Sequence, residues 1–373
     1  MNAVGIILAG GNSERLGSLT SLRATAAMPI GSSYRTVDFA ISNMSNSGIG
    51  KVAVITQYNS RSLHDHLSSA KWWDLGRKHG GLFVFTPFIS ADNAFWFRGT
   101  ADSIYQNISF LRRSNEQYVV ITSGDTVYKI DYNEMIDEHI RTGADITIMT
   151  RNVAEDENEN LCVYGVVSQD ADGRVTDFEE KPIEPQSRTI SLGTYVISRS
   201  LLIKLLEAVV EEGRYDFVRD IVERYRRKLK VYAYDYKGYW KSINSIRAYY
   251  DVNMDFLKKD IRDIFTRQEP FIETKPKDEP PAKLNTGSEF RNSLLGSGSI
   301  INGKVENSVL FRKVVVGDNS HILGSIIMEG CVIGRDCFVE NAILDKEVVL
   351  SDGKRLVGTI EEPIIIKKRA IVS

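Results

Sequence analysis

Three segments of equal length repeat one pattern near the end of the chain, and this repeat restricts the possible folds more than any other feature. The segments begin at Val305, Ile322 and Val339, each has 17 residues, and a fourth begins at Leu356. Aliphatic pairs recur at positions five and six and at positions eleven and twelve of each segment. This spacing, close to three hexapeptide turns per coil, is typical of a parallel β-helix, whose coils stack only on their neighbours. An amphipathic antiparallel sheet is the alternative, and three aligned repeats disfavour it.

A proline-rich stretch separates the repeat from the rest of the chain. Four of the nine prolines lie between positions 270 and 281, in a segment that is polar and poor in large apolar residues. Proline cannot continue a helix or a central strand, and it favours extended geometry in the residue before it. We therefore predict a stiff linker and three regions in the 373 residues: an α/β domain over 1–264, the linker over 265–292 and the β-helix over 293–373.

The first region alternates short apolar runs with amphipathic segments. Buried strands are expected in four of these runs, at residues 4–9, 52–56, 118–122 and 146–149. Helical spacing occurs at residues 36–44, 100–111 and 217–227. Continuous apolar strands that alternate with helices indicate βαβ units, in which helices cover both faces of a sheet. The predicted class is therefore α/β with a mostly parallel sheet.

Charge and cysteine content exclude several classes of protein. The 47 Lys and Arg residues nearly balance the 49 Asp and Glu residues, which argues against a nucleic-acid partner. No apolar run approaches the roughly 18–20 residues that span a bilayer, so no membrane partner is expected. The first apolar run has no basic region before it, as in a strand and not in a signal peptide. Three cysteines, an odd and sparse set, fit reduced thiols in the cytoplasm.

Two loops after predicted strands have residues suited to a phosphate and metal site. Gly10 and Gly11 follow the first strand, where backbone N–H groups can hold phosphates, and Arg15 adds a positive charge. A tight turn without a ligand is the alternative for the glycine pair alone. Asp125 ends another predicted strand, at the edge of the sheet where α/β proteins form their sites. A cap or turn role is the alternative for an isolated aspartate at that position.

Several motifs taken together resemble a known family. The chain contains LAGG-x-x-x-RL from Leu8, R-A-x-x-A-x-P from Arg23 and YR-x-x-DF-x-x-SN-x-x-NSGI from Tyr34, followed by TQY, RGTAD, SGD and EKP segments. In this order, over nearly the whole chain, they resemble bacterial glucose-1-phosphate adenylyltransferase, also called ADP-glucose pyrophosphorylase. The resemblance implies a Rossmann-like nucleotidyltransferase domain followed by a left-handed parallel β-helix. It also implies a reaction that joins ATP and glucose 1-phosphate into ADP-glucose and pyrophosphate for glycogen biosynthesis.

The resemblance also assigns roles to particular residues. In the family, Mg²⁺ and cationic side chains neutralise the triphosphate while the sugar phosphate attacks the α-phosphorus in line. Asp125 matches the metal-binding and catalytic aspartate, and Arg15 matches a phosphate-neutralising arginine. The implied nucleotide-binding positions are Gly10, Gly11, Ser13 and Gly124. The implied sugar-phosphate positions are Gly165, Glu180, Lys181 and Ser191.

Departures from the family pattern fall in this implied active site. Ser242 stands where the family has its second metal-binding aspartate, and a hydroxyl cannot replace the charge of a carboxylate. Thr25 stands where a lysine neutralises the leaving pyrophosphate. Ser13 replaces a glycine of the phosphate loop, and the segment 86–90 lacks the glutamine that contacts adenine. We therefore predict that Asp125 is insufficient by itself for binding Mg²⁺.

These losses predict a regulatory subunit of this enzyme, weakly active or inactive by itself. The chain is most similar to the D-type subunit that accompanies a catalytic partner in some Gram-positive bacteria. The resemblance implies a cytoplasmic hetero-oligomer with that catalytic subunit, a tetramer assembled partly through the β-helix. Two alternatives are an active enzyme of the family with a shifted metal site, and a non-enzymatic sensor that binds a sugar phosphate without a transferase partner. A sugar phosphate or a nucleotide is the expected small-molecule ligand.

Overall fold

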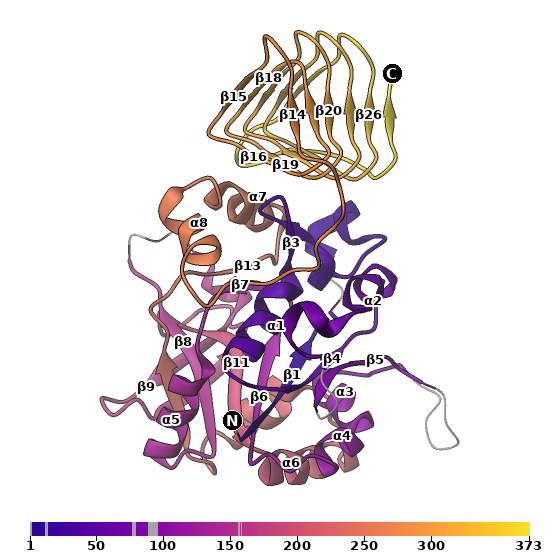
Figure 1. Ribbon diagram of the computed structural model, residues 1–373. Helices are drawn as coiled ribbons and strands as arrows, with labels where there is room; N and C mark the ends of the chain where they lie inside the picture. Colours follow the sequence, from indigo (N-terminus) through magenta and orange to yellow (C-terminus); the bar gives the residue numbers. More distant parts are fainter. Residues whose placement is uncertain (1, 12–13, 77–79, 89–95, 156, 158) are drawn as a thin grey trace.

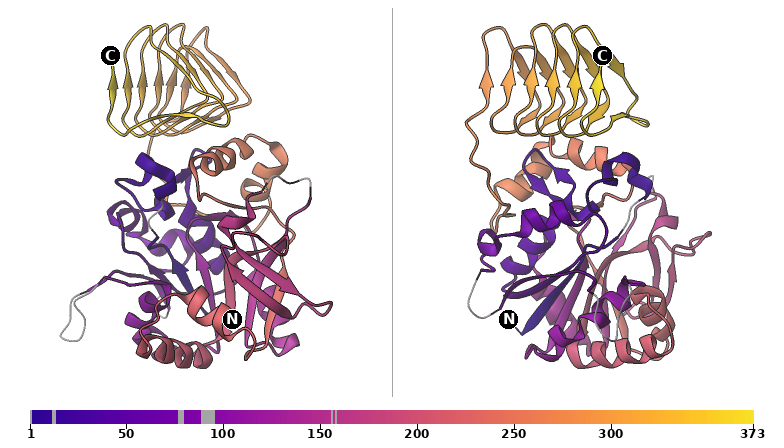
Figure 2. Two further views of the ribbon diagram at one scale, coloured as in Figure 1. Left: turned by 180° about the vertical axis from the view of Figure 1, so that it is seen from behind. Right: turned by 90° about the vertical axis from the view of Figure 1, so that its right-hand side faces the viewer.

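An N-terminal α/β domain forms the larger part of the molecule, and a β-helix lies across one end of it (Figure 1). The computed structural model describes residues 2–11, 14–76, 80–88, 96–155, 157 and 159–373. The same arrangement is visible from behind and from the side, with the coils stacked over helices of the N-terminal domain (Figure 2). The predicted fold class, α/β followed by a left-handed parallel β-helix, is confirmed.

A nine-stranded mixed sheet forms the centre of the N-terminal domain. Seven strands lie in the order β10 (Val175–Glu180), β9 (Gly165–Gln169), β11 (Thr189–Ser198), β6 (Tyr118–Ser123), β1 (Ala3–Leu8), β4 (Lys51–Ile55) and β5 (Gly81–Phe85). Two more, β8 (Ile146–Asn152) and β12 (Val231–Asp235), continue from β11. Strands β6, β1, β4 and β5 are parallel, whereas β11 runs antiparallel to β6, β8 and β9.

Helices cover both faces of this sheet. The described helices of the domain are α1 (Thr36–Asn46), α2 (Arg61–Leu67), α3 (Thr100–Gln106), α4 (Ile108–Arg112), α5 (Tyr132–Thr142), α6 (Arg199–Glu211), α7 (Ile246–Asp255) and α8 (Lys259–Thr266). Of these, α7 and α8 pack in the apolar cluster that the domain shares with the β-helix. Short helical turns are η1 (Glu14–Thr20), η2 (Thr25–Ala27), η3 (Ala70–Trp73), η4 (Leu161–Val163) and η5 (Val218–Glu223). The expected helix over 100–111 is interrupted at Asn107, and the one over 217–227 contains the π-helical turn η5. Two small sheets pair β2 (Pro29–Ile30) with β3 (Tyr34–Arg35) and β7 (Thr126–Tyr128) with β13 (Trp240–Ser242).

The β-helix has three flat faces made of short parallel strands. The first face contains β14 (Lys283–Leu284), β17 (Ile300–Ile301), β20 (Val315–Val316), β23 (Val332–Ile333), β26 (Val349–Leu350) and β29 (Ile371–Val372). The second contains β15 (Glu289–Arg291), β18 (Lys304–Glu306), β21 (His321–Leu323), β24 (Phe338–Glu340) and β27 (Arg355–Val357). The third contains β16 (Leu294–Leu295), β19 (Val309–Leu310), β22 (Ile326–Ile327), β25 (Ala342–Leu344) and β28 (Ile364–Ile366). The middle coils bury aliphatic side chains from all three faces in a common apolar interior, which also encloses Cys331 and Cys337, whereas the strands of the end coils are only partly buried or, in β14, exposed.

The segment between the two parts is shorter than the range 265–292 expected for the linker. Helix α8 continues to Thr266, and strand β14 begins the first coil at Lys283. Strand β15 pairs with β18 at a spacing of 15 residues, as Glu289 lies opposite Lys304. This coil departs from the 17-residue period, so the repeat pattern alone does not reveal it.

The two parts share one apolar cluster and one buried ion pair. Helix α7 contributes Tyr249 and Tyr250 to the cluster, and the β-helix contributes Phe311 and Met328. Beside this cluster the Arg23 guanidinium pairs with the Asp345 carboxylate, and both side chains are almost fully buried. The β-helix is therefore packed against the N-terminal domain and is not tethered only by the linker.

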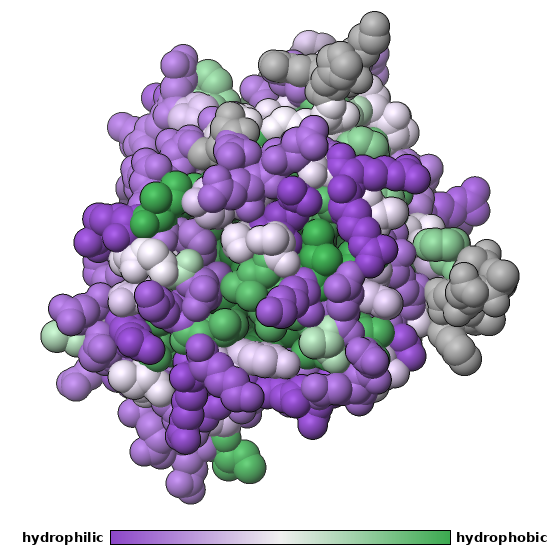
Figure 3. All heavy atoms as spheres, turned by 90° about the horizontal axis from the view of Figure 1, so that it is seen from below, coloured by the Kyte–Doolittle hydropathy of each residue, from purple (hydrophilic) through white to green (hydrophobic). Residues whose placement is uncertain are grey.

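The end of the molecule opposite the β-helix has a mixed surface. Charged and polar side chains there surround a central group of apolar ones (Figure 3). Helix α6 lies at this end, and its Leu201, Ile203 and Val210 are only partly buried (Figure 1). Within the described ranges of the chain, no helix is long and apolar enough to cross a membrane.

Candidate functional site

The ends of β1 and β6 bring the predicted phosphate loop and the predicted aspartate together. These strands pair in parallel, with Leu8 opposite Ser123, so the residues that follow them meet at one edge of the sheet. The Gly124 N–H donates to the Leu8 carbonyl oxygen at 3.0 Å. A Cβ at Gly124 would lie 3.3 Å from the Cβ of Ala9, so the two loops are in close contact.

Gly10 and Gly11 lie on the open side of this edge. A Cβ at Gly11 would meet no described atom within 4 Å, whereas one at Gly10 would lie 3.5 Å from the Cβ of Gln57. Arg15 is exposed on η1, directly after this loop. The predicted position Ser13 lies outside the described residues. The loop therefore leaves room for a ligand beside Gly11.

Asp125 lies beside the position where the family has its second carboxylate. Strand β13 pairs antiparallel with β7, so Ser242 is opposite Thr126, the residue next to Asp125. The Ile243 N–H, one residue further on, donates to the Asp125 carbonyl oxygen at 3.1 Å. The structure therefore brings Asp125 and Ser242 together, as the resemblance implies, and the second position carries a hydroxyl.

The Asp125 carboxyl is held by protein groups. Its Oδ1 accepts a hydrogen bond from the Ser123 hydroxyl at 2.5 Å. Burial raises the pKa of Asp125, and the Ser123 hydrogen bond and the charge of Lys181 oppose this rise only in part.

The described residues around Asp125 place the Ser242 hydroxyl at the position where the family resemblance implies a second carboxylate for Mg²⁺. This ion prefers an octahedral set of oxygen ligands that usually includes one or two carboxylates. Across the described part of the chain, no group of three or more His, Cys, Asp or Glu side chains is arranged to hold a metal ion. Lys241, beside Ser242, has its ammonium group 3.7 Å from Glu159 Oε2 and adds a positive charge to this region.

Thr25 occupies a buried position close to the aspartate loop. It begins η2, and the next residue, Ala26, would lie 3.3 Å from a Cβ at Gly124. The Thr25 side chain is buried, and its hydroxyl has no hydrogen-bond partner among the described residues. An unpaired buried hydroxyl is unfavourable, and Thr25 cannot supply the charge that a lysine would supply here.

The predicted sugar-phosphate residues lie together on β9 and β10. Gly165 pairs with Glu180 across the two strands. A Cβ at Gly165 would lie 2.5 Å from the Phe178 ring and 3.1 Å from Glu180 Oε2, so this position requires glycine. Lys181 has φ 53, a left-handed conformation that is unfavourable for a residue other than glycine, and its N–H donates to the Tyr164 carbonyl oxygen at 3.0 Å. The Lys181 ammonium lies 3.0 Å from Glu180 Oε1.

A kink in β11 places Ser191 beside this group. Thr189 and Ile190 pair with β9, whereas Tyr195 and the residues after it pair with β6. Gly193 has φ 70 at the register shift between the two halves. The Ser191 hydroxyl is 3.3 Å from the Tyr195 hydroxyl and accepts from the Gly193 N–H at 3.4 Å. The four predicted sugar-phosphate positions therefore lie at one place, where the sheet changes partners.

A second site, which the sequence pattern alone did not reveal, lies between the two parts of the molecule. We call it the interdomain pocket. Its charged lining comes from the N-terminal domain, the linker and the β-helix, and comprises Arg35, Lys275, Lys277, Arg312, Glu329 and Lys346. His66 also lines it, and its Nε2 lies 2.5 Å from the buried Asp38 carboxylate. Five Lys or Arg side chains against one carboxylate favour an anionic ligand.

Cations in the interdomain pocket lower each other's affinity for protons. Burial and the neighbouring Arg35 guanidinium lower the pKa of Lys346 to about 8. Burial also lowers the pKa of Arg35, and the nearby Arg23 adds to this effect. Glu329 compensates two of the cations, since its carboxylate pairs with Arg312 at 2.6 Å and with Lys346 at 2.8 Å. A bound anion would relieve the remaining repulsion.

A signal for this pocket is present in the sequence. Arg312, Glu329 and Lys346 are spaced by 17 residues, the period of the coils, so they stack at one corner of the β-helix. The repeat is recognised by its aliphatic positions. The stacked charges become visible only when the polar positions of successive 17-residue segments are compared as well.

The fold and its loops define a class of protein, and family models agree with it. A parallel set of strands carries a glycine pair after β1 and an aspartate after β6. The family model described as Nucleotidyl transferase matches residues 4–259, and the model described as GlmU-like, C-terminal hexapeptide matches residues 280–362. The N-terminal domain is a nucleotidyl transferase domain, and the β-helix is a hexapeptide-repeat region.

Similar proteins narrow this class to one family. Glucose-1-phosphate adenylyltransferase of Bacillus cytotoxicus is 36% identical over 341 residues, which cover 91% of this chain and 90% of that protein. The protein of the same name from Halalkalibacterium halodurans is 38% identical over 322 residues, covering 86% and 83%. That of Bacillus subtilis is 36% identical over 323 residues, covering 86% and 84%. The chain belongs to the glucose-1-phosphate adenylyltransferase family.

Proposed function

We propose that this chain is a regulatory subunit of a glucose-1-phosphate adenylyltransferase in glycogen biosynthesis. It has little or no activity of its own and modulates a catalytic subunit that makes ADP-glucose and pyrophosphate from ATP and glucose 1-phosphate. The two subunits form a cytoplasmic hetero-oligomer, a tetramer by the family resemblance. Mg²⁺ is bound in the catalytic subunit, which provides the carboxylates and the lysine that this chain lacks.

The pairing of β13 with β7 carries this proposal. It sets Ser242 opposite Thr126 and next to Asp125, so the position of the second carboxylate is occupied by a neutral side chain. The unpaired hydroxyl of buried Thr25, which stands where the family resemblance places a lysine, supports the same conclusion. Charge neutralisation provides most of the catalysis in phosphoryl and nucleotidyl transfer, so the loss of two charged groups removes the largest contribution.

Two retained features support binding without turnover. The sugar-phosphate positions Gly165, Glu180, Lys181 and Ser191 lie together, so a sugar phosphate still has its contacts. The interdomain pocket presents a positive lining between the nucleotidyl transferase domain and the β-helix. We propose that it binds a phosphorylated small molecule as an effector, because converging Lys and Arg side chains match phosphate groups.

An active enzyme with a shifted metal site is less well supported. Such a site needs another carboxylate near Asp125 and Ser242, and the acidic residues nearest Ser242 along the chain are Asp235 and Asp251. Asp235 forms an ion pair with Lys237, and Asp251 accepts from Arg247 Nε at 2.8 Å with each oxygen. A sugar-phosphate sensor without a partner subunit predicts the same binding properties, so only an assay with the catalytic subunit separates it from a regulatory subunit.

The test measures ADP-glucose formation by the purified chain alone and mixed with the catalytic subunit of the same organism. We expect little or no turnover by the chain alone, and a changed rate or effector response of the catalytic subunit on mixing. The double variant Ser242→Asp with Thr25→Lys should gain activity by at least about tenfold, since a single charge-stabilising group contributes about 10²–10³-fold.

The matched control is Ser242→Ala with Thr25→Lys, which restores the lysine without the carboxylate and should gain little. Turnover by the wild-type chain at the rate of an ordinary catalytic subunit would refute the regulatory function. An unchanged rate and effector response on mixing would favour the sensor instead.

A further inference from the structure

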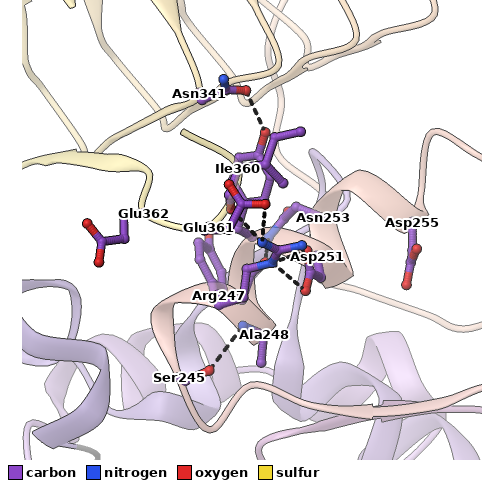
Figure 4. Close-up of polar contacts among 12 residues, drawn as sticks. Ser245, Arg247, Ala248, Asp251, Asn253, Asp255, Asn341, Ile360, Glu361 and Glu362 are labelled. Carbon is purple, nitrogen blue, oxygen red and sulfur yellow. Dashed lines mark hydrogen bonds and ion pairs between the residues drawn. The ribbon is translucent and has the colours of Figure 1, made fainter. Parts of the chain in front are cut away.

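The last coil of the β-helix contains an insertion. Ile343 pairs with Ile326, 17 positions before it, and with Ile365, 22 positions after it. The five extra residues occupy 359–363, between β27 and β28. This inserted loop leaves the coil and reaches helix α7 of the N-terminal domain (Figure 4). Its contacts there include a hydrogen bond and an ion-pair contact of Arg247.

Arg247 on the first turn of α7 binds the inserted loop. Its Nη1 donates to the Ile360 carbonyl oxygen at 2.8 Å, and the same atom lies 4.0 Å from Glu361 Oε1. Asp251, one turn further along α7, holds the other side of the guanidinium (Figure 4). Glu362, the next residue of the loop, points away from Arg247 (Figure 4).

Tyr250 makes a second contact between α7 and the β-helix. Its hydroxyl donates to the Gly324 carbonyl oxygen at 2.6 Å and lies 3.3 Å from Asn341 Oδ1. A Cβ at Gly324 would lie 2.7 Å from Asn341 Oδ1 and 3.4 Å from the Tyr250 hydroxyl, so a side chain at 324 would displace this contact. Helix α7 therefore contacts the β-helix at two places, through Arg247 and through Tyr250.

The other end of this connection is the aspartate loop. Ser242 ends β13, and Ser245, the N-cap of α7, follows three residues later and accepts from the Ala248 N–H at 3.1 Å. Between them, the buried Ile243 donates its N–H to the Asp125 carbonyl oxygen at 3.1 Å. A shift of α7 along or about its axis is therefore transmitted directly to the residue bound to Asp125.

Helix α7 also forms hydrogen bonds with the turn at residues 29–31, which leads into the lining of the interdomain pocket. The Tyr249 hydroxyl donates to the Pro29 carbonyl oxygen at 2.8 Å, and Asn253 Oδ1 accepts from the Gly31 N–H at 3.1 Å. Ser32 and the residues after it line the pocket. One helix thus contacts the inserted loop, the pocket turn and the strand beside Asp125.

We infer that Arg247 is a positioning residue: with the inserted loop 359–363 it fixes α7 on the β-helix, and α7 in turn sets the position of β13 beside Asp125. Movement of the β-helix, caused by a partner subunit or by a ligand, is then converted into movement of the aspartate loop. This inference concerns the coupling of the two parts and holds whether or not the chain catalyses turnover.

The test alters the inserted loop and measures amide hydrogen exchange in and after the remote strand β13. Deletion of 359–363 in the full chain restores the 17-residue spacing and leaves α7 and β13 unchanged in sequence. Loss of a hydrogen bond to a charged group should make the amides of residues 240–247 exchange with deuterium about three- to tenfold faster. Amides of β1 and β6, which lie outside the connection, should exchange at the wild-type rate.

Glu362→Ala is the matched control, because it alters the same loop without a contact to Arg247, and it should leave exchange at 240–247 unchanged. Arg247→Ala removes the contact from the side of α7 and should accelerate exchange of the amides of residues 356–364. If the deletion variant does not fold, the result with Arg247→Ala decides the test. Wild-type exchange at 240–247 in the deletion variant, or equal acceleration in β1 and β6, would overturn the inference.

Discussion

Removal of one partner from the buried pair Arg23–Asp345 provides a quantitative test of how the two parts of the molecule are held together. The side chains are 5% and 2% exposed, so neither charge is solvated when the other is absent. The Asp345 carboxylate also accepts from the Lys346 N–H at 2.6 Å. Arg23 in turn lies close enough to Arg35 and Lys346 to lower the pKa of both.

Breaking a buried pair by removal of one partner costs about 3–5 kcal/mol, because the remaining charge stays uncompensated in the interior. We expect Asp345→Ala to be the more destabilising variant, since it leaves Arg23 among other cations with no carboxylate of its own. Arg23→Met leaves Asp345 with one backbone donor and with cationic neighbours, so its effect should be smaller. The double variant Arg23→Met with Asp345→Leu should recover most of the loss, as apolar replacement of a buried pair is often nearly neutral.

The free energy of unfolding is measured by urea titration with linear extrapolation. Tryptophan fluorescence reports on the N-terminal domain, where Trp72, Trp73, Trp96 and Trp240 all lie, and circular dichroism reports on both parts. The control is Arg112→Met, which breaks the exposed pair with Glu207 at 2.6 Å and should cost only about 0–1 kcal/mol. Variants of the buried pair that lose no more stability than this control would refute the reasoning.

Two further predictions concern the pocket and the sugar-phosphate group. Because the pKa of Lys346 is lowered to about 8, its positive charge is lost as the pH rises through this value. The affinity of the interdomain pocket for pyrophosphate, measured by calorimetry, should therefore fall above pH 8. Lys346→Gln should remove this pH dependence, and an unchanged slope would contradict the assignment. Gly165→Ala places a Cβ 2.5 Å from the Phe178 ring, so overpacking should cost about 1–3 kcal/mol and weaken glucose 1-phosphate binding. Gly50→Ala is the control, because Gly50 is exposed and a Cβ there would meet no described atom within 4 Å, and it should leave binding unchanged. Equal affinities in the two variants would contradict the packing argument.

Much of the fold could be predicted from periodicity because burial determines the pattern of apolar residues. Strands expected at 118–122 and 146–149 are found as β6 and β8, and the 17-residue repeat forms the β-helix. The antiparallel direction of β11 could not be predicted in this way. A buried strand is apolar in either orientation, and the direction depends on long-range pairing with β6, β8 and β9.

Part of the candidate site could likewise be predicted from the sequence, and part could not. Residues at the carboxyl ends of parallel strands, such as Gly11 and Asp125, could be placed together because this edge is a general property of α/β sheets. The interdomain pocket could not, since its cations come from segments far apart in the chain, and their proximity depends on how the β-helix packs on α7. Arg35 is an example. It belongs to a motif of the family, but the motif does not predict which residues of the β-helix lie beside it.

The stacking of Arg312, Glu329 and Lys346 at one corner of the β-helix has an evolutionary consequence. Three successive coils each contribute one charged side chain to the interdomain pocket, and each coil rests only on its neighbours. A single substitution at this corner therefore changes the charge of the pocket by one or two units without disturbing the sheet that carries Asp125. The part of the pocket that lies on the β-helix can thus change its preference for a ligand independently of the loops around Asp125.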